Sequence, residues 1–337
     1  MPDKLEQINQ LPKIDLHHHM DGAIRTKTIK EMAEKHDVEL PTYNVEKLKD
    51  HVTVRKGCEG LTDFLDCFEL FYPVIQYEDA IRRIAYELCE TTYNQDVLYL
   101  ETRFAPVLLT EEGLSQEEVV TSALDGLEAG LEEFDVEINL ILCVYRGTPP
   151  EASLRTVELA QQYSDRGIVG IDIAGDESQY DADPHREAFD NARQYGLNIT
   201  AHAGEAGGVD NIREALNMGA DRIGHGVALR DDPEVLAECK ERQIPLEMCL
   251  TSNLQTGVVR TIEEHPVTDY FDHGTPVTLN TDDPAVSNIN IHHEFRLAFQ
   301  QTSFTIFDLK QILQNSVSAS FADSSTRQKL RTSIDQL

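Results

Sequence analysis

The sequence predicts an α/β protein built as a closed (β/α)8 barrel, the TIM barrel. Two observations lead to this prediction. Eight short, apolar and partly β-branched segments recur along the chain, and from the second onward amphipathic helix-like stretches separate them. Alternating strands and helices indicate a parallel sheet, and eight units fit a closed barrel better than an open doubly wound sheet. Because 337 residues are normal for one such barrel, we expect a single domain over residues 1–337.

The predicted strands are Lys13–His19, Val97–Phe104, Glu137–Arg146, Gly167–Ala174, Leu197–His202, Asp221–His225, Pro245–Thr251 and Pro276–Thr281. Apolar residues at helical spacing predict helices over Ser115–Glu133, Glu151–Tyr163, Pro184–Tyr195, Asn211–Met218 and Pro233–Arg242. The C-terminal part, Phe304–Leu337, is expected to be helical and to pack last.

The first unit is atypical because a long segment separates the first two strands. It carries helical patterns over Lys27–His36, Leu61–Gln76 and Glu78–Gln95. We interpret residues 25–95 as a helical insertion that could cover the functional site as a lid.

Charge and composition exclude several classes of function. The chain has 29 basic and 60 acidic residues, a net charge of −31, which repels nucleic-acid phosphates and anionic lipids. The N-terminal residues show no secretory signal, and no apolar run is long enough for a membrane helix. Six cysteines without a C-x-x-C pair are expected to be reduced core residues. We expect a soluble cytoplasmic protein, and adaptation to high salt is a further hypothesis.

Three consecutive histidines, His17, His18 and His19, end the first predicted strand. Side chains alternate along a strand, so His17 and His19 share one face and His18 takes the other. If His17 and His19 point into the barrel, both reach one point at its mouth, and His18 is a bystander. An H-x-H pair alone is weak evidence for a metal site, because chance produces such pairs often.

Polar residues also follow three other predicted strands. His202 ends the fifth strand and Glu205 follows it, His225 ends the sixth, and Asp282 and Asp283 follow the eighth. The carboxyl ends of barrel strands converge on one face, where active sites of this fold lie. Residues at four different strand ends are hard to explain as packing, so we predict a joint site there.

The residue types suggest the chemistry. Three neutral imidazoles and one carboxylate suit Zn²⁺, which in catalytic sites keeps a position open for water. Bound zinc lowers the pKa of that water to about 7, so hydroxide is available at neutral pH. Glu205 is not needed as a ligand and is free to carry protons, while His225 is a second candidate base or an orienter of the hydroxide.

The sequence resembles the adenosine deaminases of the metal-dependent hydrolase superfamily. The matching motifs are HHHMDGA (17–23), GIDIAGDE (170–177), TAHAGE (200–205), RIGHG (222–226) and LNTDDP (279–284), in the family's order. The resemblance implies a (β/α)8 barrel with one Zn²⁺ per chain. It implies a hydrolase acting on a cyclic amidine C–N bond, which converts adenosine and 2′-deoxyadenosine to the inosines plus ammonia in purine salvage. The expected partner is therefore a small purine nucleoside.

The resemblance also assigns roles to individual positions. It implies that the zinc ligands are His17, His19, His202 and Asp282. Glu205 would protonate the purine N1, and His225 would hold and polarise the attacking hydroxide. The substrate would be bound by Asp283 at N7, by the backbone N–H of Gly175 at N3, and by Asp21 at the ribose 5′-hydroxyl, with His19 near the sugar.

Two features narrow the resemblance. Metal-dependent hydrolases with two metals usually carry a modified lysine at the end of strand four, and GIDIAGDE has none, so one metal is expected. Asp21-Gly22 is typical of nucleoside deaminases, whereas adenine and aminofutalosine deaminases usually carry a pair such as Glu-Gly. Two alternatives stay open: a deaminase of another aminopurine such as adenine, and a non-catalytic nucleoside-binding barrel.

Several other polar residues have no role in this prediction. Arg103, near the end of strand two, could be a buried charge paired with a barrel acid. Glu247, inside a strand, is a candidate partner for it, or for a metal-bound histidine. Surface positions are expected for His36, His51, His185, His265 and His273, because they lie in polar segments.

Overall fold

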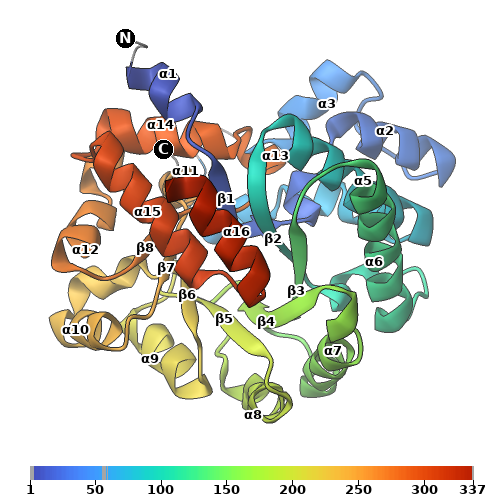
Figure 1. Ribbon diagram of the computed structural model, residues 1–337. Helices are drawn as coiled ribbons and strands as arrows, with labels where there is room; N and C mark the ends of the chain where they lie inside the picture. Colours follow the sequence, from blue (N-terminus) through green and yellow to red (C-terminus); the bar gives the residue numbers. More distant parts are fainter. Residues whose placement is uncertain (1–3, 55–57, 59, 336–337) are drawn as a thin grey trace.

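A computed structural model describes residues 4–54, 58 and 60–335 of the chain. Eight parallel strands follow one another around the sheet in sequence order (Figure 1). Backbone hydrogen bonds join the last strand end back to the first: the His19 N–H donates to the Asp282 carbonyl, and the Asp282 N–H donates to the His17 carbonyl, each at 2.8 Å. The predicted TIM barrel is confirmed.

The strands are β1 (Lys13–His19), β2 (Val97–Phe104), β3 (Ile138–Tyr145), β4 (Ile168–Ala174), β5 (Asn198–Ala203), β6 (Arg222–His225), β7 (Leu246–Met248) and β8 (Val277–Leu279). Between β2 and β8 the chain forms the helices α6 (Gln116–Glu133), α7 (Pro150–Gln162), α8 (Arg186–Tyr195), α9 (Val209–Met218), α10 (Pro233–Glu241), α11 (Leu250–Gln255) and α12 (Val267–His273). The chain ends with α13 (Pro284–Ser287), α14 (Ile291–Gln301), α15 (Ile306–Ala319) and α16 (Ser324–Asp335), after beginning with α1 (Lys4–Asn9).

The segment between β1 and β2 is helical, as predicted. It contains α2 (Thr26–Lys35), α3 (Val45–Val52), α4 (Leu61–Leu65) and α5 (Glu78–Asn94), and it lies to the right of the barrel in Figure 1. The helix expected over Leu61–Gln76 is wrong in its extent. After α4 the chain forms two 3-10 turns, η2 (Phe68–Leu70) and η3 (Tyr72–Ile75). Pro73 lies at the start of η3 and has no N–H, so an unbroken α-helix could not run through to Gln76.

Strand β7 is also shorter than the predicted Pro245–Thr251. It ends at Met248, and helix α11 begins at Leu250, so the apolar run Leu246–Leu250 belongs to two elements. An apolar run buried on all sides has the same composition in a strand and in a helix, which explains the error.

The amino end of the barrel is closed by the connection between α15 and α16 (Figure 1). The guanidinium of Arg222 lies 3.6 Å from the centroid of the Phe321 ring and donates to the Ala319 carbonyl. The Phe321 N–H donates to the buried carboxylate of Glu101. The opposite, carboxyl ends of the strands are left for the functional site.

The described residues contain no helix that is long and apolar enough to cross a membrane. Cys89, Cys143, Cys239 and Cys249 are buried, as expected for core residues, whereas Cys58 and Cys67 are only half-buried.

Candidate active site

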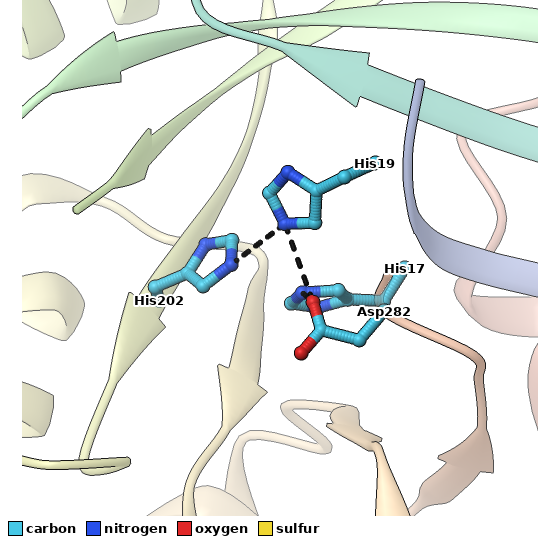
Figure 2. A group of neighbouring side chains, drawn as sticks. All are labelled: His17, His19, His202 and Asp282. Carbon is cyan, nitrogen blue, oxygen red and sulfur yellow. Dashed lines mark hydrogen bonds and ion pairs between the residues drawn. The ribbon is translucent and has the colours of Figure 1, made fainter. Parts of the chain in front are cut away.

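Four side chains from three strand ends converge inside the carboxyl mouth of the barrel (Figure 2). Nε2 of His17 lies 3.2 Å from Oδ1 of Asp282, and Nε2 of His19 lies 3.4 Å from the same oxygen. Nε2 of His19 also lies 3.2 Å from Nε2 of His202. The predicted set His17, His19, His202 and Asp282 is therefore brought together around one point.

The second nitrogen of two of these rings is already engaged. Nδ1 of His17 lies 2.8 Å from Oε2 of Glu247, and Nδ1 of His202 lies 2.9 Å from Oδ2 of Asp172. A carboxylate behind an imidazole keeps the proton on Nδ1 and leaves Nε2 as a lone-pair donor toward the centre. Nε2 of His17 is buried and has no hydrogen-bond partner among the described residues. These donors fit a bound cation, and an N3O set at this spacing fits Zn²⁺.

Arg103 connects the two carboxylates that support the imidazoles. Its guanidinium donates to Asp172 Oδ2 and to Glu247 Oε2, each at 3.0 Å, and all three side chains are fully buried. Both expectations for Arg103 and Glu247 are confirmed: Glu247 contacts both the arginine and a histidine of the cluster. Arg103 holds the pKa of Glu247 far below its usual range against the effect of burial, so this carboxylate is ionised.

His18 takes the other face of β1, as predicted. Its Nδ1 lies 3.2 Å from the hydroxyl of Thr102 on β2, and the side chain does not reach the cluster. Gly224 provides the room for His17, because a Cβ atom at this position would lie 3.0 Å from the imidazole.

Glu205 lies in the tight turn that follows β5. Three backbone N–H groups of this turn, from Gly204, Glu205 and Gly207, donate to the carboxylate of Glu177. Glu177 lies within the GIDIAGDE motif but had no predicted role. Its buried carboxylate shapes the loop that carries Glu205.

Two carboxyl groups at the site have raised pKa values. Burial, with the nearby charges of Asp282 and Glu177, raises the pKa of Glu205 well above its usual value. Burial and the charge of Asp282 also raise the pKa of Asp283 well above its usual value. Within the part of the chain that the structure describes, Oε1 of Glu205 and Oδ1 of Asp283 are buried without a hydrogen-bond partner, so both groups have unused hydrogen-bonding capacity.

Backbone strain marks two positions of the site. His225 and Asp282 adopt positive φ angles of 63° and 64°. Residues other than glycine rarely occupy this left-handed region of backbone conformation. Such strain persists only where the surrounding structure holds it, and it is concentrated at functional sites. Here it turns both side chains inward at the ends of β6 and β8.

Asp21 and Asp283 lie on the β1 and β8 sides of the same cavity. A Cβ atom on Gly22 would lie 1.8 Å from Oδ1 of Asp283, so only glycine allows this approach. The hydroxyl of Tyr72 donates to Oδ2 of Asp21 at 3.0 Å. Tyr72 belongs to the insertion and was not among the predicted site residues.

The cavity has a polar floor and an apolar roof. His19, His202 and Asp282 form the floor together with Glu205, His225 and Asp283. The roof includes Leu61, Phe64, Leu65 and Phe68 of the insertion. Gly175 lines one wall with a positive φ of 98°. All predicted site residues other than the buried His17 therefore line a single cavity, and His17 lies directly beneath it.

The surface position expected for His185 and His265 is wrong. His185 is 1% exposed and contacts the Ser153 hydroxyl, and His265 is 4% exposed and contacts Asn253. Polar neighbours in the sequence suggested exposure, but these histidines are covered by helices that pack over them.

A barrel with three imidazoles and a carboxylate at the carboxyl ends of β1, β5 and β8 defines a hydrolase of the metal-dependent TIM-barrel type. The family model described as adenosine deaminase matches residues 12–337, nearly the whole chain. The chain belongs to the adenosine deaminase family, whose enzymes are hydrolases acting on cyclic amidine C–N bonds. The predicted resemblance is confirmed.

Similar proteins cover the chain almost completely. An adenosine deaminase of Clostridium kluyveri is 38% identical over 321 residues, which cover 95% of this chain and 92% of that protein. The structure of an Arabidopsis N6-mAMP deaminase has a TM-score of 0.88 at 28% identity and covers 98% of this chain and 100% of its own. An adenine deaminase of Arthrobacter aurescens has a TM-score of 0.89 at 25% identity, covering 97% and 98%.

Proposed function

We propose that this protein is a zinc-dependent adenosine deaminase that converts adenosine or 2′-deoxyadenosine and water to inosine or 2′-deoxyinosine and ammonia, in purine salvage. The observation that supports this best is the arrangement around Glu205. Its carboxyl group, which has a raised pKa and is not one of the four clustered residues His17, His19, His202 and Asp282, lines the same cavity as that cluster. A site that only bound metal or nucleoside would have no need for this acid.

The metal ligands in this proposal are His17, His19, His202 and Asp282. When bound there, Zn²⁺ would act as a Lewis acid that makes a water molecule nucleophilic at neutral pH. Asp172, Glu247 and Arg103 keep two of the imidazoles oriented for this task.

Glu205 supplies the proton. Addition of a water oxygen to C6 of the purine breaks the conjugation of the ring, and protonation at N1 offsets this cost. The raised pKa of Glu205 favours the protonated carboxyl group, which can give its proton to N1. The carboxylate that results can then help transfer a proton to the leaving amine.

His225 would contact the attacking oxygen, and Asp283 would bind the purine ring. Nε2 of His225 lies 3.6 Å from Oε2 of Glu205, so the imidazole can contact the attacking oxygen beside the acid. The raised pKa of Asp283 favours its protonated form, which would donate to N7 of the purine.

The remaining contacts recognise the nucleoside. Gly175 would offer its N–H to N3, and Asp21 would accept a hydrogen bond from the ribose 5′-hydroxyl, with His19 near the sugar. We also propose that residues 25–95 act as a lid, because the apolar side chains of α4 and η2 cover the cavity and would exclude water from the reaction.

The test is the ultraviolet spectrum of adenosine incubated with purified protein, with and without prior chelation. The expected result is a shift toward the spectrum of inosine, which chelation abolishes and zinc restores. E205Q, which cannot give up a proton, should retain zinc and lose turnover. A spectral shift with adenine but not with adenosine would keep the deaminase chemistry and identify adenine as the substrate. No shift with any aminopurine, in zinc-loaded protein, would refute the deaminase.

A further inference from the structure

His265 is a buried titratable group that the mechanism above does not use. It stands at one end of a chain of hydrogen bonds that reaches His225. Nδ1 of His265 accepts from the Val267 N–H at 3.2 Å, and Nε2 of His265 lies 3.2 Å from Oδ1 of Asn253. Nδ2 of Asn253 lies 3.0 Å from Nδ1 of His225. His265, Asn253 and His225 are 4%, 0% and 1% exposed, so bulk water does not compete for these bonds.

The direction of every bond in this chain follows from its first member. Val267 is the first residue of α12, where a backbone N–H has no partner within the helix, and this N–H can only donate. Nδ1 of His265 therefore carries no proton. The proton of the neutral ring lies on Nε2, and this N–H donates to the amide oxygen of Asn253.

The orientation of the Asn253 amide follows from the proton position on His265. Its oxygen faces His265, so its NH2 group faces His225 and donates to Nδ1 of that ring. Nδ1 of His225 is thus an acceptor, and the proton of its neutral imidazole lies on Nε2. This nitrogen is buried without a hydrogen-bond partner in the described part of the chain, and His225 lines the cavity.

The surroundings of this hydrogen-bond chain favour the neutral forms of the His265 and His225 rings. Burial, followed by the positive charge of Arg230, lowers the pKa of His265 to about 3. Burial also lowers the pKa of His225 well below its usual value, although the charge of Asp282 opposes this shift. A doubly protonated His265 would direct a second N–H against the Val267 N–H, which the geometry excludes.

We propose that Asn253 and His265 are positioning residues that hold His225 in the Nε2–H tautomer. His225 then presents a hydrogen-bond donor to the cavity and orients the attacking oxygen, rather than serving as its first base. The kinetic consequence rests on the proposed deaminase function, but the tautomer does not.

The first measurement is therefore spectroscopic. Protein labelled with ¹⁵N-histidine, as isolated, is examined by NMR through the couplings between ring nitrogens and ring carbon-bound protons, and His225 is assigned by its loss in H225Q. We expect the unprotonated, pyridine-type signal of His225 on Nδ1. The same signal on Nε2 would overturn the proposal.

N253D tests the hydrogen-bond chain from His265 through Asn253 to His225 with almost no change in side-chain shape. Aspartate can only accept from His225, so Nδ1 should become protonated, and the Nδ1 pyridine-type signal of His225 should disappear. In H265Q the glutamine amide can still donate to Asn253, so the wild-type tautomer should persist. N44D is the matched control, because exposed Asn44 is the N-cap of α3 and aspartate caps equally well. An unchanged His225 signal in folded N253D would refute the proposal that Asn253 sets the tautomer of His225.

The kinetic readout is kcat separated from KM. N253D should lower kcat for adenosine roughly 10- to 100-fold with little change in KM, because His225 acts on the attacking oxygen and not on the bound purine. H265Q and N44D should stay within about threefold of the wild type. Equal kcat in folded N253D and N44D would contradict the proposed orienting role. If the tautomer is as expected but no aminopurine is deaminated, the positioning role stands and the proposed function fails.

Discussion

Gly22 and Asp283 approach each other so closely that no side chain fits between them. The Cβ atom of an alanine at position 22 would lie 1.8 Å from Oδ1 and 2.6 Å from Cγ of Asp283. The turn after β1 and the loop after β8 are therefore matched across the closing seam of the barrel. Asp283, which we propose as the N7 ligand, owes its position to this missing Cβ atom.

G22A should displace Asp283 and lower kcat/KM for adenosine roughly 100-fold, because a shift of about 1 Å in a substrate-positioning group has effects of this size. Steady-state kinetics on folded protein measures the loss. G208A is the matched control, since Gly208 has an ordinary negative φ and open space around its Cβ position. Equal activity of both variants would exclude Asp283 as a substrate ligand.

Asp172 should control metal affinity through His202. In D172N the amide no longer stabilises the orientation and basicity of the imidazole, so the zinc dissociation constant should rise about 10- to 100-fold. Competition with a chromogenic chelator measures this constant without reference to activity. Arg103 retains Glu247 as a partner in this variant, so the barrel is expected to fold. D190N, which alters an exposed ion pair, is the control. The same zinc affinity in both variants would show that Asp172 does not strengthen metal binding by His202.

The protonation state of Glu205 should appear in the pH dependence of kcat. The acid is active only when protonated, and its pKa is raised, so activity should persist above the usual pKa of a glutamate and fall as pH rises through the raised pKa. At low pH, activity should fall for another reason: protonation of the imidazole ligands releases metal. Parallel measurement of bound zinc separates the two limbs. A rate that rises steadily into the alkaline range would contradict the role of Glu205 as an acid.

Tyr72 should contribute to recognition of the ribose 5′-hydroxyl by orienting Asp21. Loss of a hydrogen bond to a charged group costs about 1.5 kcal/mol or more, roughly tenfold. Y72F should therefore lower kcat/KM for adenosine about tenfold and leave 5′-deoxyadenosine, which lacks this hydroxyl, nearly unchanged. Y77F is the control, because Tyr77 stacks on His36 and does not line the cavity. An equal loss for both substrates would show that Tyr72 acts only on the fold.

The sequence by itself determined the barrel and the residues at its mouth. Strand composition and helical periodicity are local properties, so the order of strands and helices could be predicted from them. Alternation along β1 separated His18 from His17 and His19, and the convergence of strand ends brought Glu205, His225 and Asp282 into one site.

Only the tertiary structure decided what stands behind these residues. The pairing of Arg103 with Asp172 and Glu247 joins three strands, and the contact of Asn253 with His225 and His265 joins three separate segments. Such pairs depend on distances between elements far apart in the chain, which no local pattern encodes. For the same reason His265 was expected at the surface: its polar neighbours are visible in the sequence, but the helix that buries it is placed only by the closed barrel.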